Sequence, residues 1–330
     1  MKISVIIPVY NEEGRVGSTI ESLLDQKFKN YEIIAVNDAS KDQSIDVLRK
    51  YKDKIKIIDK KKNEGQASAV NSGLEIASGD IIARTDADSL VAPDWLERIN
   101  NDFKDKEVVA VGGWLDVANK GSYWALANSF KDAVFNGFLR KSVTPNILPG
   151  ANTAIRASAF RAVGGYPTKN SYYSEDFQLY SKLSKIGKVI KDDKLVIRTY
   201  YPDSIKGSIK RKYFWGMAGA PLFGRSNTLK FYMRPLYYTG LIVSGVLALA
   251  LSLYWPALSL LFAALFVVGI LPMTAGLFLV AAAYIVMSKN YKYLKVLPTT
   301  LFYPFLLEFV YFCGLLRGLM GGKVRVWRET

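Results

Sequence analysis

The sequence contains no histidine and only one cysteine, Cys313. The lack of histidine excludes Ser-His-Asp and Cys-His catalysis, imidazole general bases and zinc sites built on histidine. A single cysteine excludes a disulfide within the chain, and its place in an apolar stretch indicates a small hydrophobic residue. Any acid–base chemistry must therefore rest mainly on carboxylates, lysines or tyrosines.

Charge is absent from one long stretch, since no Asp, Glu, Lys or Arg occurs from Pro235 through Ser288. A helix of about 20 residues spans a hydrocarbon core of about 30 Å, so this stretch is too long for one span. It predicts a membrane region over residues 236–320 that begins with two spans within 236–287. We expect the break between these spans near Tyr254-Trp255-Pro256 or near Pro272.

A second apolar segment covers residues 297–320, but Pro304, Glu308 and Arg317 interrupt it. An interfacial or re-entrant helix would tolerate these residues. The length of the segment favours instead a third span-length helix, packed against the other two, with Glu308 facing protein. The basic tail 321–330 would then lie outside, against the positive-inside tendency, so both interpretations stay open.

The chain is basic, with 44 Lys and Arg residues against 29 Asp and Glu residues and a net charge of +15. Such a balance is typical of proteins that bind nucleic acid or anionic membranes. The segment 206–235 has no acidic residue, is rich in basic and aromatic side chains, and adjoins the uncharged stretch. It therefore predicts a juxtamembrane or interfacial segment on the cytoplasmic side of a membrane.

No segment resembles a nucleic-acid-binding module. We therefore expect membrane lipids as partners, no nucleic acid, and a multi-pass protein of the cell membrane with a cytoplasmic catalytic domain. The lysine run Lys60-Lys61-Lys62 is expected to be a solvated surface of that domain.

Residues 1–205 are expected to form the catalytic domain, because strand and helix patterns alternate along the first hundred residues. Alternating βα units predict an α/β fold with a mostly parallel, doubly wound sheet. Ligands of such sheets bind beyond the carboxyl ends of the strands. The expected strands are Lys2–Pro8, Tyr31–Asn37, Ile55–Asp59 and Asp80–Thr85, and the expected helices run from Val16 to Leu24, Ile45 to Tyr51 and Ala67 to Ala77.

The rest of this domain is less regular in its pattern. We expect a strand over Val108–Trp114, extended segments over Gly150–Ile155 and Val189–Ile197, and helices over Tyr123–Arg140 and Asp176–Ile186.

A pair of carboxylates, Asp86 and Asp88, follows the apolar run Ile81-Ile82-Ala83. Side chains two positions apart point the same way if the strand continues through them. Two like charges at that spacing repel unless a cation neutralises them, and Mg²⁺ or Mn²⁺ suits oxygen ligands that include substrate phosphates. Asp88 is the first predicted metal ligand, and Asp86 is a second contributor to the metal or to a donor sugar.

Other motifs accompany this pair in a fixed order along the chain. They are Val5-Ile6-Ile7-Pro8-Val9-Tyr10-Asn11-Glu12-Glu13, Asn37-Asp38-Ala39-Ser40, Asn63-Glu64-Gly65, Pro149-Gly150-Ala151-Asn152 and Ser174-Glu175-Asp176. The ordered set resembles the family 2 glycosyltransferases, which have the nucleotide-diphospho-sugar transferase (GT-A) fold. The resemblance covers residues 2 to roughly 200.

This resemblance implies the roles of several residues. It implies donor-binding roles for Pro8, Tyr10, Asp38, Asn63, Gly65 and Asp86, with the base and ribose near the first two strand ends. Gly150 and Asn152 would shape the acceptor side. In the Glu175-Asp176 pair, Asp176 is the expected general base for direct displacement with inversion at the anomeric carbon.

One motif departs from the family pattern. Processive membrane synthases of this family carry Q/R-x-x-R-W near the membrane, and the nearest stretch here is Arg211-Lys212-Tyr213-Phe214-Trp215. Arg211 and Trp215 fit, and Trp215 is assigned to the acceptor side, but Phe214 stands where the second arginine is expected. This weakens the case for a processive polymerase.

The sequence therefore favours a membrane-bound, metal-dependent, inverting glycosyltransferase. It would move a sugar from a nucleotide-diphosphate sugar to the hydroxyl of a lipid-linked or saccharide acceptor. A polyprenyl-phosphate sugar synthase and a processive polysaccharide synthase are the alternative enzymes. A membrane subunit that binds nucleotide sugars without catalysis is the non-enzymatic alternative.

Overall fold

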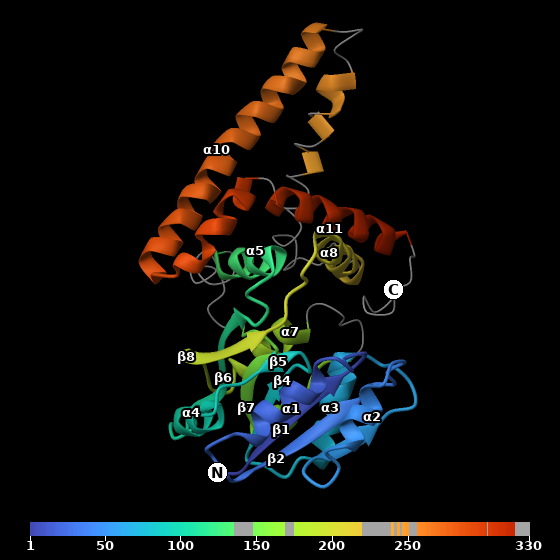
Figure 1. Cartoon of the computed structure of the whole chain (residues 1–330), viewed down its shortest axis with the longest axis vertical. Helices are drawn as coiled ribbons and strands as arrows, with labels where there is room; N and C mark the ends of the chain where they lie inside the picture. Colours follow the sequence, from blue (N-terminus) through green and yellow to red (C-terminus); the bar gives the residue numbers. More distant parts are fainter. Residues whose placement is uncertain are drawn as a thin grey trace. The chain divides into compact units, whose positions relative to one another are not determined.

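A computed structural model of the chain is shown in Figure 1. The structure describes residues 1–134, 148–168, 175–219, 239–240, 243–244, 246–250, 256–301 and 303–320. The chain divides into two compact units. The first unit takes its residues from Met1–Asn119 and Thr144–Tyr200, and the second from Lys120–Val143 and Tyr201–Arg328.

The first unit is built on one eight-stranded sheet with the order β3-β2-β1-β4-β7-β6-β8-β5 (Figure 1). Its strands are β1 (Ile3–Val9), β2 (Tyr31–Asn37), β3 (Lys56–Asp59), β4 (Ile81–Thr85), β5 (Ser89–Leu90), β6 (Val108–Val117), β7 (Asn152–Arg156) and β8 (Lys188–Thr199). The helices of this unit are α1 (Val16–Leu24), α2 (Ser44–Arg49), α3 (Gln66–Ile76), α4 (Trp95–Asp102), α6 (Ala157–Ala162) and α7 (Glu175–Leu183).

The first half of the sheet is parallel, as the alternation of strand and helix predicts. Strand β1 pairs in parallel with both β2 and β4, and β2 pairs in parallel with β3. Side chains of a strand alternate between the two faces of its sheet. Val5 accordingly packs in one core with Ile20 of α1, whereas Ile6 packs in the other with Val70 of α3. The two helices therefore cover opposite faces.

The second half of the sheet makes it mixed rather than mostly parallel. Strand β7 is antiparallel to both β4 and β6, and β5 is antiparallel to β8, while β6 and β8 are parallel. Apolar alternation does not encode strand direction, so the sequence pattern could not distinguish these pairings. The antiparallel register sets Asn152 opposite Thr85, at the strand end that precedes the carboxylate pair.

Helices form the described parts of the second unit. They are α5 (Tyr123–Asp132), α8 (Ile205–Gly219), α10 (Pro256–Ser288), the 3₁₀ helix η4 (Tyr291–Leu301) and α11 (Tyr303–Leu319). The segment expected as a linker or interfacial helix is thus helical over α8. Residues 135–147, which include the end of the expected helix Tyr123–Arg140, lie outside the described residues.

Helices α8 and α11 pack closely through two glycines. A Cβ atom on Gly216 would collide with the carbonyl oxygen of Tyr311, and one on Gly314 would collide with that of Tyr213. Beside this crossing, Lys212 Nζ lies 3.0 Å from Glu308 Oε1, with both side chains mostly buried. Glu308 therefore faces protein, as predicted, but its partner lies on α8 and not on one of the two expected spans.

The apolar part of this unit differs in detail from the expected spans. Helix α10 begins at Pro256, one of the two predicted break points, and continues through Pro272. The segment 297–320 does not form one helix, because η4 runs to Leu301 and α11 covers only 17 residues from Tyr303. Proline is tolerated in the first turn of a helix, and Pro304 is the second residue of α11.

A search of the described helices finds none that combines the length and the hydropathy required to cross a membrane. The basic tail 321–330 lies outside the described residues.

Candidate active site

The predicted donor-binding residues Pro8, Tyr10 and Asp38 lie at the carboxyl ends of two adjacent strands. Strands β1 and β2 are parallel, and Val9 is the register partner of Asn37. Tyr10 and Asp38 are buried. The structure therefore brings the first two motifs to one edge of the sheet.

The loops that follow these strands are joined to each other. Asn11 and Ala39 have positive φ angles of 52° and 57°, which turn the chain sharply as it leaves each strand. The backbone N–H of Asn11 donates to Ser40 Oγ, and the backbone N–H of Lys41 donates to Asn11 Oδ1. The geometry of one loop therefore depends on the other.

The Asp38 carboxylate holds the turn that contains Asn63 and Gly65. It accepts hydrogen bonds from the backbone N–H groups of Glu64 at 3.1 Å and Gly65 at 2.8 Å. Gly65 has φ 89° and ψ 166°, a region open almost only to glycine. This contact places the end of β2 beside the N-terminus of α3, where helix N–H groups favour an anion such as a diphosphate.

Lys60 belongs to the same cluster, although the sequence pattern indicated a solvated lysine. Its Nζ lies 3.0 Å from Asp38 Oδ1 and 2.8 Å from Glu64 Oε2, and its side chain is only 10% exposed. The expected solvated surface is therefore wrong for Lys60. Lys60 directly follows the end of β3 at Asp59, and the other site residues of this sheet also lie at strand ends. This position could have identified Lys60 from the sequence.

The carboxylates Asp86 and Asp88 occupy the turn between β4 and β5, since β4 ends at Thr85. The strand does not continue through them, and they contact different partners. Asp86 Oδ1 accepts a 2.8 Å hydrogen bond from Gln66 Nε2, whereas Asp88 Oδ1 lies 3.4 Å from Thr199 Oγ1. The turn thus places Asp86 towards α3 and Asp88 towards the end of β8.

These two carboxylates are the residues that the sequence assigned to a divalent cation, which would have to take most of its ligands from elsewhere. Among the residues that the structure describes, no group of three or more acidic, histidine or cysteine side chains could hold a metal. Asp86 and Asp88 would be the protein ligands of Mg²⁺ or Mn²⁺, with donor phosphates and water completing the shell.

A buried arginine, Arg84, links this turn to the Glu175-Asp176 motif. Its Nη2 lies 3.5 Å from Asp86 Oδ1 and its Nη1 lies 3.6 Å from Asp176 Oδ1, while its side chain is 5% exposed. The structure thereby brings together two motifs that are far apart in the sequence. Sequence reasoning missed Arg84, although a charged residue inside the apolar strand β4 is itself an unusual signal.

Glu175 and Asp176 open α7 and have perturbed acidity. Burial raises the pKa of Glu175 to about 8, with Arg84 opposing the shift and the charge of Asp176 adding to it. Burial also raises the pKa of Asp176; the Arg84 charge opposes this, and the Asp86 charge adds to it. Burial therefore favours the protonated form of both carboxyl groups, and the nearby Arg84 charge opposes this in both.

The two residues assigned to the acceptor side of this motif differ in their surroundings. A Cβ atom on Gly150 would lie 3.0 Å from both Arg84 Nη1 and Asp176 Oδ2, so Gly150 lies directly against this pair. Asn152 is fully buried instead. Its amide donates to the carbonyls of Trp114 and Leu195 and accepts from Trp95 Nε1. The Asn152 side chain thus joins three parts of the core and does not face an acceptor.

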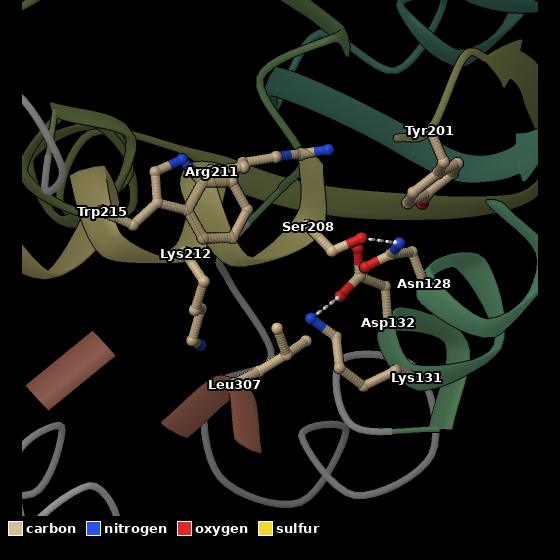
Figure 2. Close-up of a pocket in the computed structure, with 9 residues that line it drawn as sticks. All are labelled: Asn128, Lys131, Asp132, Tyr201, Ser208, Arg211, Lys212, Trp215 and Leu307. Atoms are coloured by element: carbon tan, nitrogen blue, oxygen red, sulfur yellow. Dashed lines mark hydrogen bonds and ion pairs between the residues drawn. The ribbon is translucent and has the colours of Figure 1, made fainter. Parts of the chain in front are cut away.

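Trp215 lies in the second unit, where it lines a small pocket between α5, α8 and α11 (Figure 2). The Arg211 guanidinium lies 4.5 Å from the centroid of the Trp215 ring and 6.0 Å from that of Tyr201. Asn128 Nδ2 donates to Ser208 Oγ at 2.7 Å, which ties α5 to α8. The two residues that fit the Q/R-x-x-R-W pattern therefore contact each other as a stacked cation–aromatic pair.

Comparison with known proteins identifies relatives over the first unit. Residues 4–164 match the family described as glycosyl transferase family 2. An uncharacterized glycosyltransferase of Haemophilus influenzae is 30% identical over 196 residues, which cover 56% of this chain and 61% of that protein. The poly-beta-1,6-N-acetyl-D-glucosamine synthase of Staphylococcus aureus is 29% identical over 245 residues, covering 71% of this chain and 59% of the synthase. The chain thus spans about three fifths of the length of these curated relatives.

A solved structure shares the fold over most of the chain. It is a mannosyltransferase from Pyrobaculum calidifontis in complex with GDP-Man and Mn²⁺, with a TM-score of 0.59 and 21% identity. The match covers 98% of this chain and 88% of the mannosyltransferase, and it shows a GT-A-like fold. The mixed α/β sheet and the match over residues 4–164 make this part of the chain similar to the domains of glycosyl transferase family 2.

Proposed function

We propose that the protein is an inverting glycosyltransferase that moves a sugar from a nucleotide-diphosphate donor to an acceptor hydroxyl. The observation that carries this proposal is the position of Arg84 between Asp86 and Asp176. Arg84 thereby bridges Asp86, which is predicted to bind the metal or the donor, and Asp176, which is predicted to act as the base. The bound GDP-Man and Mn²⁺ of the mannosyltransferase with the same fold support a nucleotide-sugar donor and a divalent cation.

The donor would bind along the strand ends. Tyr10 and Asp38 would contact the base and ribose, because an ionised carboxylate accepts hydrogen bonds from hydroxyl or N–H groups. The turn at Asn63 and Gly65 would lie near the diphosphate. A divalent cation on Asp88 and Asp86 would supply charge stabilisation to the nucleoside diphosphate as it leaves.

Asp176 would act on the acceptor side. As the acceptor oxygen attacks the anomeric carbon, its hydroxyl proton passes to the Asp176 carboxylate, and the bond from that carbon to the donor phosphate breaks. A carboxylate of raised pKa is a stronger base for this step. One displacement inverts the anomeric configuration. Glu175, which is next to Asp176, would be neutral when protonated and would then add no negative charge beside the base.

A second candidate is a processive polysaccharide synthase. The similarity to the Staphylococcus aureus poly-beta-1,6-N-acetyl-D-glucosamine synthase and the stacking of Arg211 on Trp215 favour it. Phe214 in place of the second arginine argues against it. The length of the product distinguishes the candidates, because single transfer adds one sugar and a synthase builds a polymer.

We also propose that the enzyme works at the cytoplasmic face of the cell membrane on a lipid-linked acceptor. Support comes from the uncharged stretch Pro235–Ser288 and from the basic residues of α8 that precede it. Large apolar side chains of α10, including Leu260, Val268 and Leu279, are exposed. Extraction of the cell membrane with carbonate tests this: the protein should stay in the membrane fraction, and its release would overturn the proposal.

The orientation of the tail is tested separately. A cysteine added after Thr330, in a Cys313→Ala background, is labelled with an impermeant reagent on intact cells. Labelling would place the tail outside and support a third crossing by residues 297–320. Labelling only after permeabilisation would place the tail inside.

The central experiment is a screen for transfer. Radiolabelled nucleotide sugars are incubated with the full-length protein, Mg²⁺ or Mn²⁺, and a membrane lipid extract or oligosaccharides, and the product is identified. Asp176→Asn should abolish product, whereas Asp46→Asn, on the exposed side of α2, should not. Binding of nucleotide sugar without any transfer would favour the non-catalytic subunit instead.

A further inference from the structure

Arg84 occupies the centre of the candidate site. It lies on β4, and its guanidinium contacts Asp86 on one side and Asp176 on the other. The guanidinium also lies 5.2 Å from the centroid of the Tyr166 ring, as expected for a cation–π contact. The turn after β4, the segment at Tyr166 and the start of α7 therefore meet at one buried positive charge.

This guanidinium is not fully bonded. Arg84 Nε and Nη1 are buried and have no hydrogen-bond partner among the described residues, and the same holds for Asp176 Oδ1. Buried polar groups in native proteins are almost always paired, and leaving them unpaired is costly. The 3.6 Å between Nη1 and Asp176 Oδ1 is just longer than a hydrogen bond. A small movement of either side chain would form it.

The surroundings confine the guanidinium to this position. Gly150 leaves room for it, because a Cβ atom there would come within 3.0 Å of Arg84 Nη1. Tyr166 is itself held, since its backbone N–H donates to Asn71 Oδ1 and its carbonyl accepts from Asn71 Nδ2, both at 2.8 Å. Gly150 and Tyr166 therefore limit the space around the guanidinium, which lies between the two carboxylates.

We propose that Arg84 is a positioning residue that couples the donor side of the site to the base. Engagement of Asp86 by the donor and its cation frees the guanidinium to close on Asp176 and to orient that carboxylate towards the acceptor hydroxyl. This inference rests on the proposed function. It predicts a loss of turnover, and not of donor affinity, when the guanidinium is removed.

The chain offers a matched control in Arg156. It follows the same pattern of an arginine in a strand of this sheet, and its guanidinium lies 5.3 Å from the centroid of the Phe103 ring. Among the described residues, its hydrogen bonds go to the backbone carbonyls of Val108, Phe103 and Asp105 and to Met1 Sδ, and none goes to a carboxylate. Removing Arg156 should therefore lower stability without changing the chemistry.

The test compares Arg84→Met, Arg84→Lys and Arg156→Met with the wild-type protein in three measurements. These are kcat and acceptor KM, donor Kd by calorimetry, and the melting temperature. Arg84→Met should lower kcat by about 100-fold while acceptor KM and donor Kd change by less than about threefold. The kcat of Arg84→Lys should be about tenfold higher than that of Arg84→Met, because lysine keeps the positive charge but lacks the planar guanidinium with its two donor groups. Arg156→Met should lower the melting temperature and leave kcat per folded protein unchanged.

A double-mutant cycle makes the coupling explicit. If Arg84 acts through Asp176, adding Arg84→Met to Asp176→Asn should lower kcat by less than threefold further. A kcat within threefold of wild type for Arg84→Met, or an additive loss in the double variant, would overturn the inference. If Arg84→Met does not fold, the test rests on Arg84→Lys. A kcat of Arg84→Lys equal to that of the wild-type protein would show that the guanidinium is not needed and would overturn the inference.

The failure of this inference is distinguishable from failure of the proposed function. A wild-type protein that transfers sugar, with an inactive Asp176→Asn and active Arg84 variants, contradicts the coupling alone. A folded wild-type protein that transfers no sugar from any nucleotide donor contradicts both.

Discussion

The Asp38 carboxylate accepts a 2.8 Å hydrogen bond from the backbone N–H of Gly65. This bond joins the end of β2 to the start of α3, two segments to which the sequence assigned the donor. Asp38 is thus both a predicted ligand for the base and the acceptor that shapes the turn beside the diphosphate. Changes to either residue should alter donor binding together with stability.

The first prediction concerns this turn. Gly65→Ala forces a side chain into a backbone conformation at φ 89° and ψ 166°, which should lower the free energy of unfolding by about 1–3 kcal/mol. Donor affinity should fall as well, because the turn shifts. Urea unfolding and donor calorimetry measure the two effects. Gly14→Ala, where an added Cβ atom would meet no described atom within 4 Å, is the control. Equal stability of both variants would contradict the strain at Gly65.

The second prediction concerns the metal. Excess chelator should abolish transfer, and Mg²⁺ or Mn²⁺ should restore it. Asp88→Asn should lose the part of donor affinity that depends on the cation, because an amide brings no charge to the site. Calorimetry with and without Mn²⁺ measures this, with Asp94→Asn, at the residue that precedes α4, as the control. Full activity in excess chelator would rule out the metal.

The third prediction separates binding from chemistry. Asp176→Asn removes the proton acceptor at nearly constant shape, so kcat should fall by roughly 10²–10⁴-fold while donor affinity is kept. Because burial raises the pKa of Asp176, and the base works only when deprotonated, wild-type kcat should fall on acidification at a pH above about 4, the usual range of an aspartate. Measuring kcat as a function of pH tests for this fall on the acidic side. A normal turnover in the variant would eliminate Asp176 as the base.

The fourth prediction concerns Glu32, which crosslinks three segments of the first unit. Burial works to raise the pKa of Glu32, but hydrogen bonds from Lys56, Ser4 and Ser78 lower it to about 2 from an ordinary value of 4.5. A lowered carboxyl pKa stabilises the fold above the unfolded value, and this contribution is lost as the pH falls from about 4.5 towards 2.

Glu32→Gln should accordingly lower the free energy of unfolding by about 2–3 kcal/mol at pH 7 and by much less near pH 2. Denaturant unfolding at both pH values is the measurement. Glu97→Gln, an exposed position on α4, should have little effect at either pH. A difference between wild type and Glu32→Gln that does not depend on pH would contradict the assignment.

The fifth prediction concerns the crossing of α8 and α11. Gly314→Ala places a methyl group against the carbonyl oxygen of Tyr213 and should lower stability by about 1–3 kcal/mol. Gly240→Ala, where an added Cβ atom would meet no described atom within 4 Å, should leave the melting temperature unchanged or raise it. Equal melting temperatures for the two variants would show that the helices do not pack this closely.

The strands and helices from the start of the chain to Thr85 were predictable from the sequence. Apolar periodicity reflects burial directly, and the predicted strand Tyr31–Asn37 agrees with β2. The short β5 and the helices α4 and α6 were not predicted. Helix α4 begins with the buried Trp95, and its pattern is too short to stand out.

The sequence by itself determined which motifs are present, in which order, and that carboxylates must supply any acid–base chemistry in a chain without histidine. It also indicated the strand ends where Asp38 and Asp86 would lie, since carboxyl ends of parallel strands share one edge.

Only the tertiary structure decided which of these residues meet. Arg84 pairs with Asp86 and Asp176, and Lys60 pairs with Asp38, through contacts between elements that no local pattern connects. Asn152 turned into the core because β7 runs antiparallel to β4 and brings its amide to Trp95, Trp114 and Leu195. Strand direction and side-chain partners depend on packing between distant segments, and a sequence pattern records only which residues are apolar, small or charged.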